Sequence, residues 1–180
     1  AGRRICRLFD SEMQRQADRR LLIHNQLRNA LRNNELVLFY QPQHMVSNNE
    51  LIGLEALVRW NHPIMGMVPP GDFIGLAEET GLIVPIGEWV LQEACATLAK
   101  WSLESEKQHL SIAVNISVVQ FSKDNFVQIV LNALEISGAN PQLLKLEITE
   151  TLLANTVRAR AVSRRLGASM EGGLSNANRA

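Results

Sequence analysis

The sequence predicts an α/β protein whose strands form part of a parallel (β/α)₈ barrel. In its second half, short apolar runs alternate with helical segments of about 10 to 17 residues, which is the pattern of parallel βα units. A complete barrel of this class needs roughly 250 residues. This chain has 180 residues and about four predicted strands. We therefore expect a partial barrel that is preceded by a helix and has unpaired strands at the edges of its sheet.

The composition is that of a globular protein with one sizeable core. Of the 180 residues, 46% are apolar and 20% are charged, and the formal net charge is zero. This balance provides no broad basic surface, so we expect no DNA or RNA partner. No apolar run approaches the roughly 20 residues of a membrane span. Cys6 and Cys95 form no C-x-x-C pair, which favours two unreactive thiols in a reducing compartment.

Residues 11–34 form a polar segment with the spacing of an exposed linker helix. Ser11 is a suitable N-cap residue at its start. Apolar residues recur near one face at Met13, Ala17, Leu21, Leu27 and Leu31. Because the rest of the segment is polar and rich in arginine, we expect most of this helix to face solvent.

Turn residues and apolar periodicity predict the remaining elements. Strands are predicted at 36–41, 50–60, 109–117 and 143–149, and helices at 72–79, 85–101 and 124–137. The first two strands can form a hairpin through the turn at 47–49. Proline and glycine residues between 61 and 70 predict a loop without regular structure. Residues 156–180 have the composition of a poorly ordered tail.

Three side chains with oxygen donors fall within predicted strands, namely Glu55, Asn115 and Glu147. Carboxylate and amide oxygens are hard ligands that suit Mg²⁺ or Mn²⁺ better than Zn²⁺. Glu55 and Arg59 are four residues apart in a predicted strand, so their side chains face the same way. A structural ion pair between them, or exposure of both to solvent, is therefore as good an explanation of Glu55 as a metal site. Asn115 could equally cap a helix or bond to a neighbouring backbone. Spacing alone leaves these alternatives open.

Five groups of motifs make the sequence similar to one known family. They are YQP at 40–42, GLEALVRW at 53–60, PGDFI at 70–74 with AEETGLI at 77–83, VNIS at 114–117 with QF at 120–121, and LEITE at 146–150. In order and spacing they resemble the EAL domain family across residues 29–153. The segments GRR at 2–4, LFD at 8–10 and EMQ at 12–14 resemble, more loosely, the end of a GGDEF domain and the linker helix that follows it.

The resemblance implies a modified TIM barrel with one antiparallel strand. It also implies hydrolysis of cyclic di-GMP to linear pGpG, assisted by two divalent cations, Mg²⁺ or Mn²⁺, that activate a water. Glu55, Asn115 and Glu147 match metal ligands of the family, and Gln41 and Arg59 match residues that contact the dinucleotide. No further residue is assigned a catalytic role. A bacterial, cytoplasmic domain is implied, and its parent protein can be membrane-tethered.

The second half of the family's active site has no counterpart in this sequence. The family continues with paired aspartates, a lysine, a glutamate and a glutamine, but the chain has no aspartate after Asp124, no lysine after Lys145 and no glutamine after Gln142. We therefore expect a GGDEF-like end at 1–10, a linker helix at 11–34, a partial EAL domain at 35–155 and a divergent, disordered tail at 156–180.

These departures predict that the truncated chain does not turn over cyclic di-GMP. The alternative to an enzyme is a non-catalytic remnant that binds the dinucleotide or another protein. Self-association through the open edge of the sheet is one form that such a protein interaction could take, because an unpaired strand offers free backbone donors and acceptors.

Overall fold

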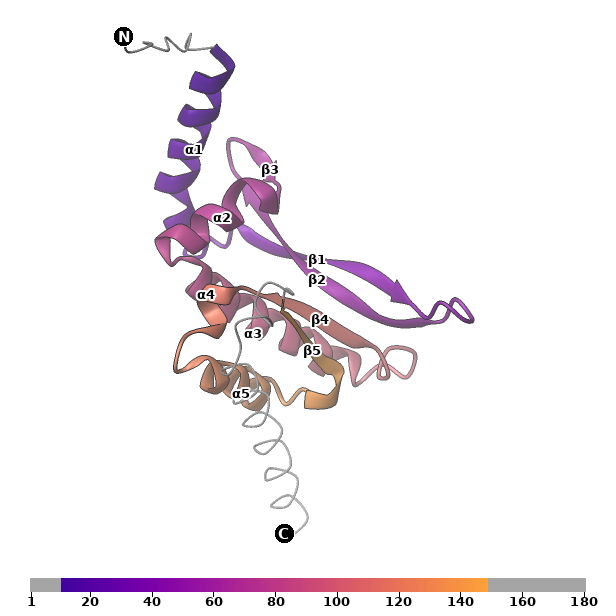
Figure 1. Ribbon diagram of the computed structural model, residues 1–180. Helices are drawn as coiled ribbons and strands as arrows, with labels where there is room; N and C mark the ends of the chain where they lie inside the picture. The colour runs from indigo at the N-terminus through magenta and orange to yellow at the C-terminus, as the bar shows by residue number, and fades with distance from the viewer. Residues whose placement is uncertain (1–10, 149–180) are drawn as a thin grey trace, which may run out of the picture.

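A computed structural model describes residues 11–148 of the chain (Figure 1). The expected GGDEF-like end at 1–10 and the expected tail at 156–180 lie outside these residues. The elements are α1 (Ser11–Ala30), β1 (Leu36–His44), β2 (Leu51–His62), β3 (Gly66–Val68), α2 (Pro70–Thr80), α3 (Ile83–Trp101), β4 (Ser111–Ile116), α4 (Val118–Phe121), α5 (Phe126–Ser137), a 3-10 turn (Pro141–Leu143) and β5 (Leu144–Ile148).

The strands form one mixed sheet in the order β1-β2-β4-β5, with β3 paired to β2. β1 is antiparallel to β2, whereas β2, β4 and β5 run parallel. Each parallel crossover contains a helix, α3 between β2 and β4 and α5 between β4 and β5. This arrangement confirms the predicted α/β class and the partial barrel. The antiparallel strand β1 was expected, whereas the short β3, which is also antiparallel to β2, was not.

The segment at 61–70 differs from the loop that the sequence predicted. β2 continues to His62, and β3 then pairs back on it with Val68 opposite Trp60. Gly66 makes this return possible, since its φ of 70° lies in the left-handed region that residues with a side chain avoid. Proline and glycine therefore end strands here without removing regular structure, and the sheet has a fifth strand.

The two faces of the sheet have different surroundings. On one face, Ala56 and Val114 are buried beneath α3 and α5, whose own Leu91, Leu98 and Val130 are buried in the same cluster. Burial of each of these valine and leucine side chains contributes about 1.5 to 3 kcal/mol, so this face holds the helices to the sheet. The β1–β2 hairpin extends beyond these helices (Figure 1). The opposite face carries the candidate site.

Helix α1 docks on the rest of the chain through its C-terminal part. Ile23, Leu27 and Ala30 are almost fully buried, whereas Met13 and Leu21 are 50% and 61% exposed. Exposure of Met13 and Leu21 agrees with the expected solvent-facing helix, whereas the burial of Ile23 and Ala30 was not expected. The buried set has the spacing 0, 4 and 7, which places it on one side of a helix.

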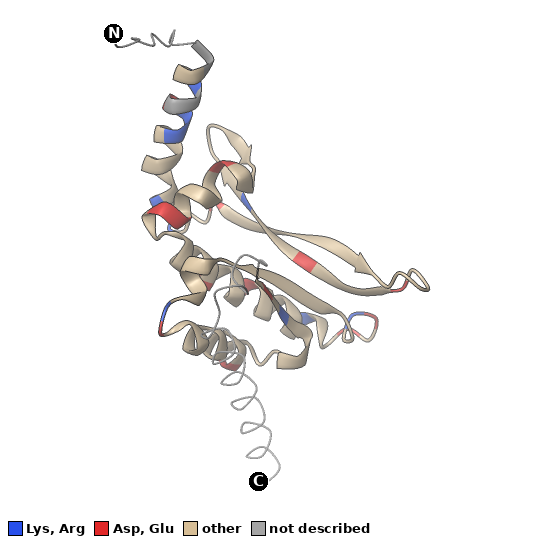
Figure 2. Cartoon of the chain, viewed as in Figure 1, with Lys and Arg blue, Asp and Glu red and all other residues tan. Residues whose placement is uncertain are grey.

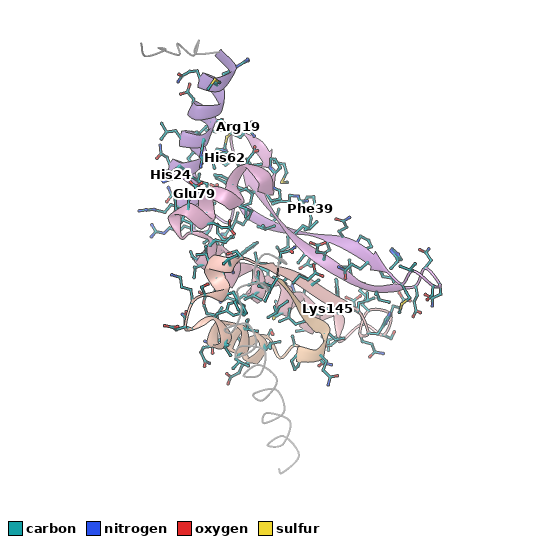
Figure 3. All side chains as sticks on the ribbon, in the orientation of Figure 1. Arg19, His24, Phe39, His62, Glu79 and Lys145 are labelled. Atoms are coloured by element: carbon teal, nitrogen blue, oxygen red, sulfur yellow. The ribbon has the colours of Figure 1, made fainter. Side chains whose placement is uncertain are left out.

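Polar contacts also link α1 to its neighbours. Arg19 and Arg20 pair with Asp72 and Glu79 of α2, each at 2.7 Å, and Figure 2 shows basic segments along α1 beside acidic segments of α2. Figure 3 labels Arg19, His62 and Glu79 in this region. Exposed ion pairs of this kind stabilise by about 0.2 to 1 kcal/mol each, so the buried apolar residues dominate the docking.

The buried His62 fixes the junction between α1 and the hairpin. Its Nδ1 accepts the backbone N–H groups of Ile64 and Met65, both at 3.0 Å. The proton of the neutral ring is therefore on Nε2, which donates to the side-chain oxygen of Gln26 on α1. His62 thus has a structural role at this junction.

Among residues 11–148, no helix combines the length and the apolarity that crossing a membrane requires. The described cysteine, Cys95, is buried in α3 without a disulfide partner. Burial raises the pKa of its thiol to about 11, against a smaller opposing effect of a hydrogen bond with Ser137. A thiol in such surroundings is unreactive, as the sequence predicted for Cys95, whereas Cys6 lies outside the described residues.

Candidate functional site

The register of the strands places the three predicted metal ligands on one face of the sheet. Glu55 of β2 lies opposite Ala113 of β4, and two residues further along β4, Asn115 lies opposite Glu147 of β5. Side chains alternate between faces along a strand, so residues paired across strands, and those two positions away, share a face. Glu55, Asn115 and Glu147 therefore project from three adjacent strands towards the same side.

Glu55 and Asn115 are in direct contact. The side-chain Nδ2 of Asn115 donates to the Glu55 Oε1 at 2.6 Å. Glu55 is half-buried, while Asn115 and Glu147 are exposed. Within residues 11–148, Glu147 has no hydrogen bond to either of them. The structure thus brings two of the three candidates together and places the third on the next strand, with its carboxylate open to solvent.

Arg59 does not form the ion pair with Glu55 that the sequence left open. Its guanidinium donates to the carbonyl oxygen of Val58 at 2.9 Å and lies 5.8 Å from the centre of the Phe39 ring on β1. A cation over an aromatic face gains about 0.5 to 1 kcal/mol at a partly exposed site. These contacts hold Arg59 on the same face as Glu55, four residues further along β2.

Gln41 extends this polar face to the neighbouring strand β1. It lies directly opposite Glu55 in the antiparallel pair and is exposed. Phe39, labelled in Figure 3, is on the same strand face and is 51% exposed. Lys145, also labelled there, precedes Glu147 by two positions on β5. We define the site face as the side of the sheet that carries Gln41, Glu55, Arg59, Asn115 and Glu147.

A cavity of ≈ 230 Å³ opens beside the site face, between the sheet and helices α2 and α3. Arg59 and Asn115 line it on the sheet side, and Ile74 and Glu78 line it on α2. Most of the lining is apolar and a few residues are polar, which is typical of small-ligand sites. Sequence reasoning did not select Glu78, although it belongs to the AEETGLI motif at 77–83.

A short turn after β4 forms another part of the cavity wall. Ser117 and Gln120 there make reciprocal hydrogen bonds at the start of α4. The sequence did not predict α4, because four residues are too few to show a helical period. The spacing of a serine followed three residues later by a glutamine was the available signal, since it is the capping-box pattern.

The oxygen donors of the site face suit a hard divalent cation. The described residues contain no cluster of three or more His, Cys, Asp or Glu side chains that could hold a metal. The candidate set differs from such a cluster, because it combines two carboxylates with one amide. Asn115 donates through Nδ2, so its Oδ1 is the atom that a cation would use. The chemistry of these donors fits Mg²⁺ or Mn²⁺.

The family model described as "EAL domain" matches residues 24–169. The chain belongs to the EAL domain family. The match begins within α1 and continues past the end of β5. It therefore includes all of the strands that carry the site face.

Known EAL proteins resemble this chain in sequence and in structure. The bifunctional diguanylate cyclase/cyclic di-GMP phosphodiesterase MucR of Pseudomonas aeruginosa is 45% identical over 150 residues. A solved structure of the MucR phosphodiesterase in complex with c-di-GMP superposes with a TM-score of 0.75 and 43% identity. The EAL enzyme Bd1971, with cAMP and cyclic di-GMP bound, gives a TM-score of 0.75 at 30% identity.

The match covers most of this EAL chain but only part of each relative. It covers 83% of this chain and 22% of MucR in sequence, and 82% of this chain and 60% of the solved MucR phosphodiesterase. For Bd1971 the shares are 86% and 43%. The relatives thus contain long regions without a counterpart in this EAL chain.

Proposed function

We propose that the site face binds cyclic di-GMP together with a divalent cation, as the first half of an EAL-type phosphodiesterase site. The observation that carries this proposal is the common orientation of Glu55, Asn115 and Glu147, with Glu55 and Asn115 in hydrogen-bond contact. The likeness to a MucR phosphodiesterase structure that contains c-di-GMP supports the choice of ligand. Because the proposed ligand is a bacterial second messenger, the proposal includes a cytoplasmic location.

Mg²⁺ or Mn²⁺ is the cation that we propose for Glu55, Asn115 and Glu147. Two carboxylates supply negative charge, and the amide oxygen supplies a neutral hard donor. When bound, such a cation lowers the pKa of a coordinated water and so supplies a nucleophile for phosphodiester hydrolysis. The protein's own part is to hold the three oxygens on neighbouring strands, where backbone pairing restricts their movement.

Arg59 and Gln41 are the residues that we propose for the dinucleotide. A guanidinium presents several N–H donors in a planar fork that matches two phosphate oxygens. Arg59 uses one of its nitrogens on the carbonyl of Val58, so its other N–H groups can serve a ligand. Gln41, exposed opposite Glu55, adds an amide that can both donate and accept.

We expect binding without turnover by the purified 180-residue chain. By resemblance, hydrolysis also uses paired aspartates and a lysine, and the sequence contains no aspartate after Asp124 and no lysine after Lys145. A site with ligands on one side only can hold a cation without completing a two-metal arrangement. A catalytic chain remains the second candidate function, and it is favoured by the family match across residues 24–169.

Isothermal titration calorimetry with cyclic di-GMP and Mg²⁺ tests the binding proposal. We expect Arg59→Ala to weaken binding at least about tenfold, since a charge-assisted contact to phosphate is lost. Arg28→Ala, at an exposed position of α1, is the matched control and leaves the affinity unchanged. Failure of the wild-type chain to bind, or equal affinity of Arg59→Ala, would contradict the proposal.

Chromatographic detection of pGpG in the same samples separates the two candidate functions. Turnover that Glu55→Ala abolishes would establish the chain as a phosphodiesterase. Binding without pGpG formation would support the proposed binding without turnover.

We also propose self-association through β5. It is the outer strand of the described sheet, next to β4, so its other edge has backbone groups that a second copy could pair with. Light scattering after size-exclusion chromatography should show a mass that rises from monomer to dimer with concentration. A mass that stays monomeric over a hundredfold range of concentration would contradict this proposal.

A further inference from the structure

The turn that follows the candidate ligand Asn115 is held by its own hydrogen bonds. Asn115 is the second-to-last residue of β4, and Ser117 is the N-cap of α4 directly after the strand. The Ser117 backbone N–H donates to Gln120 Oε1 at 3.1 Å, and the Gln120 backbone N–H donates to Ser117 Oγ at 3.3 Å. This capping box fixes the direction in which the chain leaves β4.

Gln120 is unusual for a capping residue because its side chain is buried. Its exposed fraction is 5%, whereas glutamine side chains are mostly exposed in proteins. Phe121, the next residue, is also buried and contacts Phe126, with ring centres 5.6 Å apart. The turn is therefore attached to the core at its far end, and Gln120 is enclosed between that end and α3.

Gly87 of α3 provides the space that the Gln120 amide occupies. A Cβ atom at position 87 would lie 1.6 Å from Nε2 and 2.5 Å from Cδ of Gln120, far inside any allowed contact. Alanine is favoured over glycine in a helix interior by roughly 0.5 to 1 kcal/mol. The close packing of the Gln120 side chain against α3 thus explains why glycine stands at position 87.

The capping box lies at the wall of the cavity beside the site face. Gly87, Gln120, Ser117 and Asn115 all line the same cavity. Because Asn115 lies two residues before Ser117, a change in the direction of the turn alters the end of β4 and the amide of Asn115. The contact that reports such a change is the 2.6 Å hydrogen bond from Asn115 to Glu55.

We propose that Gln120 is a positioning residue for the ligand Asn115, and that Gly87 is required because only a residue without a side chain leaves room for the Gln120 amide. This inference rests on the proposed function for the importance of Asn115 as a ligand. The placement of the Asn115 amide can nevertheless be tested without any ligand.

The test compares four single variants and one double variant of the 180-residue chain. Gly87→Ala and Gln120→Ala remove the buried amide from its place, whereas Gln120→Glu keeps an oxygen that can accept from Ser117 N–H. Gly75→Ala is the matched control, because Gly75 is also inside a helix but its Cβ would meet nothing within 4 Å. Two readouts are needed: the side-chain amide resonance of Asn115, and the affinity for Mn²⁺.

We expect Gly87→Ala and Gln120→Ala to shift the Asn115 amide resonance and to weaken Mn²⁺ binding about tenfold, as loss of a group that orients a metal ligand does. Gln120→Glu should stay within about twofold of wild type, and Gly75→Ala should change neither readout. The double variant Gly87→Ala/Gln120→Ala should be no weaker than Gln120→Ala alone, because both changes act through one side chain.

An unchanged Asn115 resonance in Gln120→Ala, with only a lower melting temperature, would overturn the inference and leave Gln120 a purely structural residue. Gln120→Ala and Gln120→Glu decide the question even if Gly87→Ala does not fold. If the wild-type chain binds no Mn²⁺, the proposed function fails, and the Asn115 resonance still decides whether Gln120 positions that amide.

Discussion

Replacement of Trp60 by phenylalanine tests how α1 is joined to the sheet. Trp60 is fully buried on β2, and its Nε1 donates to the Glu35 Oε2 at 2.8 Å, in the segment that links α1 to β1. Loss of a hydrogen bond to a charged group costs about 1.5 to 3 kcal/mol, and the lower end applies because Glu35 remains partly in contact with water. The smaller ring adds about 1 kcal/mol of lost packing. We expect Trp60→Phe to lower the free energy of unfolding by about 2 to 3 kcal/mol near neutral pH.

The same bond gives this loss a defined pH dependence. Burial acts to raise the pKa of Glu35, but hydrogen bonds from Trp60 and Asn33 outweigh it, and the pKa lies below its usual value. A lowered pKa in the folded state means that Glu35 stabilises the fold above its unfolded-state pKa. This contribution is lost as the pH falls through the folded-state pKa. The difference between wild type and Trp60→Phe should therefore shrink as the pH falls through the folded-state pKa of Glu35.

Urea denaturation followed by circular dichroism at about pH 7 and about pH 3.5 measures both quantities. Trp89→Phe is the matched control, because Trp89 is half-buried on α3 and its indole has no hydrogen bond within the described residues. Its destabilisation should be the same at both pH values. An equally large, pH-independent loss for Trp60→Phe would refute the proposed role of the Glu35 carboxylate.

Three further results are expected from the same structure. In urea denaturation, Leu91→Ala should lower the free energy of unfolding by about 2 to 5 kcal/mol, because Leu91 is 0% exposed. Leu103→Ala, at 87% exposure, should change it by less than about 0.5 kcal/mol. Equal losses for the two variants would contradict the described core. With its pKa raised to about 11, Cys95 should resist alkylation at pH 8 until the chain unfolds, and rapid modification by mass spectrometry would show that it is accessible. A double-mutant cycle on Arg20 and Glu79 should give a coupling below about 1 kcal/mol that falls with added salt, and a larger, salt-independent value would mean that the pair is shielded from water.

The sequence predicted those parts of the fold that repeat a local pattern. The alternation at 53–60 correctly placed Glu55 and Arg59 on one face of a strand, and the motif order correctly indicated an EAL fold. The short β3 was missed because three residues carry no period, and its pairing depends on a turn at Gly66. The docking of α1 was missed because Ile23 and Ala30 are buried in contacts with parts of the chain that are distant in sequence, among which α2 is the main neighbour of α1.

The candidate site shows a similar division. Side-chain type and strand position were enough to select Glu55, Asn115 and Glu147 as candidates. Whether Glu55 contacts Arg59 or Asn115 depends on the parallel register of β2 with β4, which no local pattern contains. The space that Gly87 leaves for Gln120 likewise joins two elements that are far apart along the chain.

Mn²⁺ binding followed by electron paramagnetic resonance tests the central claim, that the site face holds a divalent cation, most directly. We expect the wild-type chain to reduce the signal of free Mn²⁺. Glu55→Gln should weaken this binding at least about tenfold, because the loss of a residue that only hydrogen-bonds to a metal ligand already lowers metal affinity by about that factor. Glu88→Gln, at an exposed position of α3, is the control and should bind like wild type. Equal Mn²⁺ affinity of Glu55→Gln and wild type would contradict the claim.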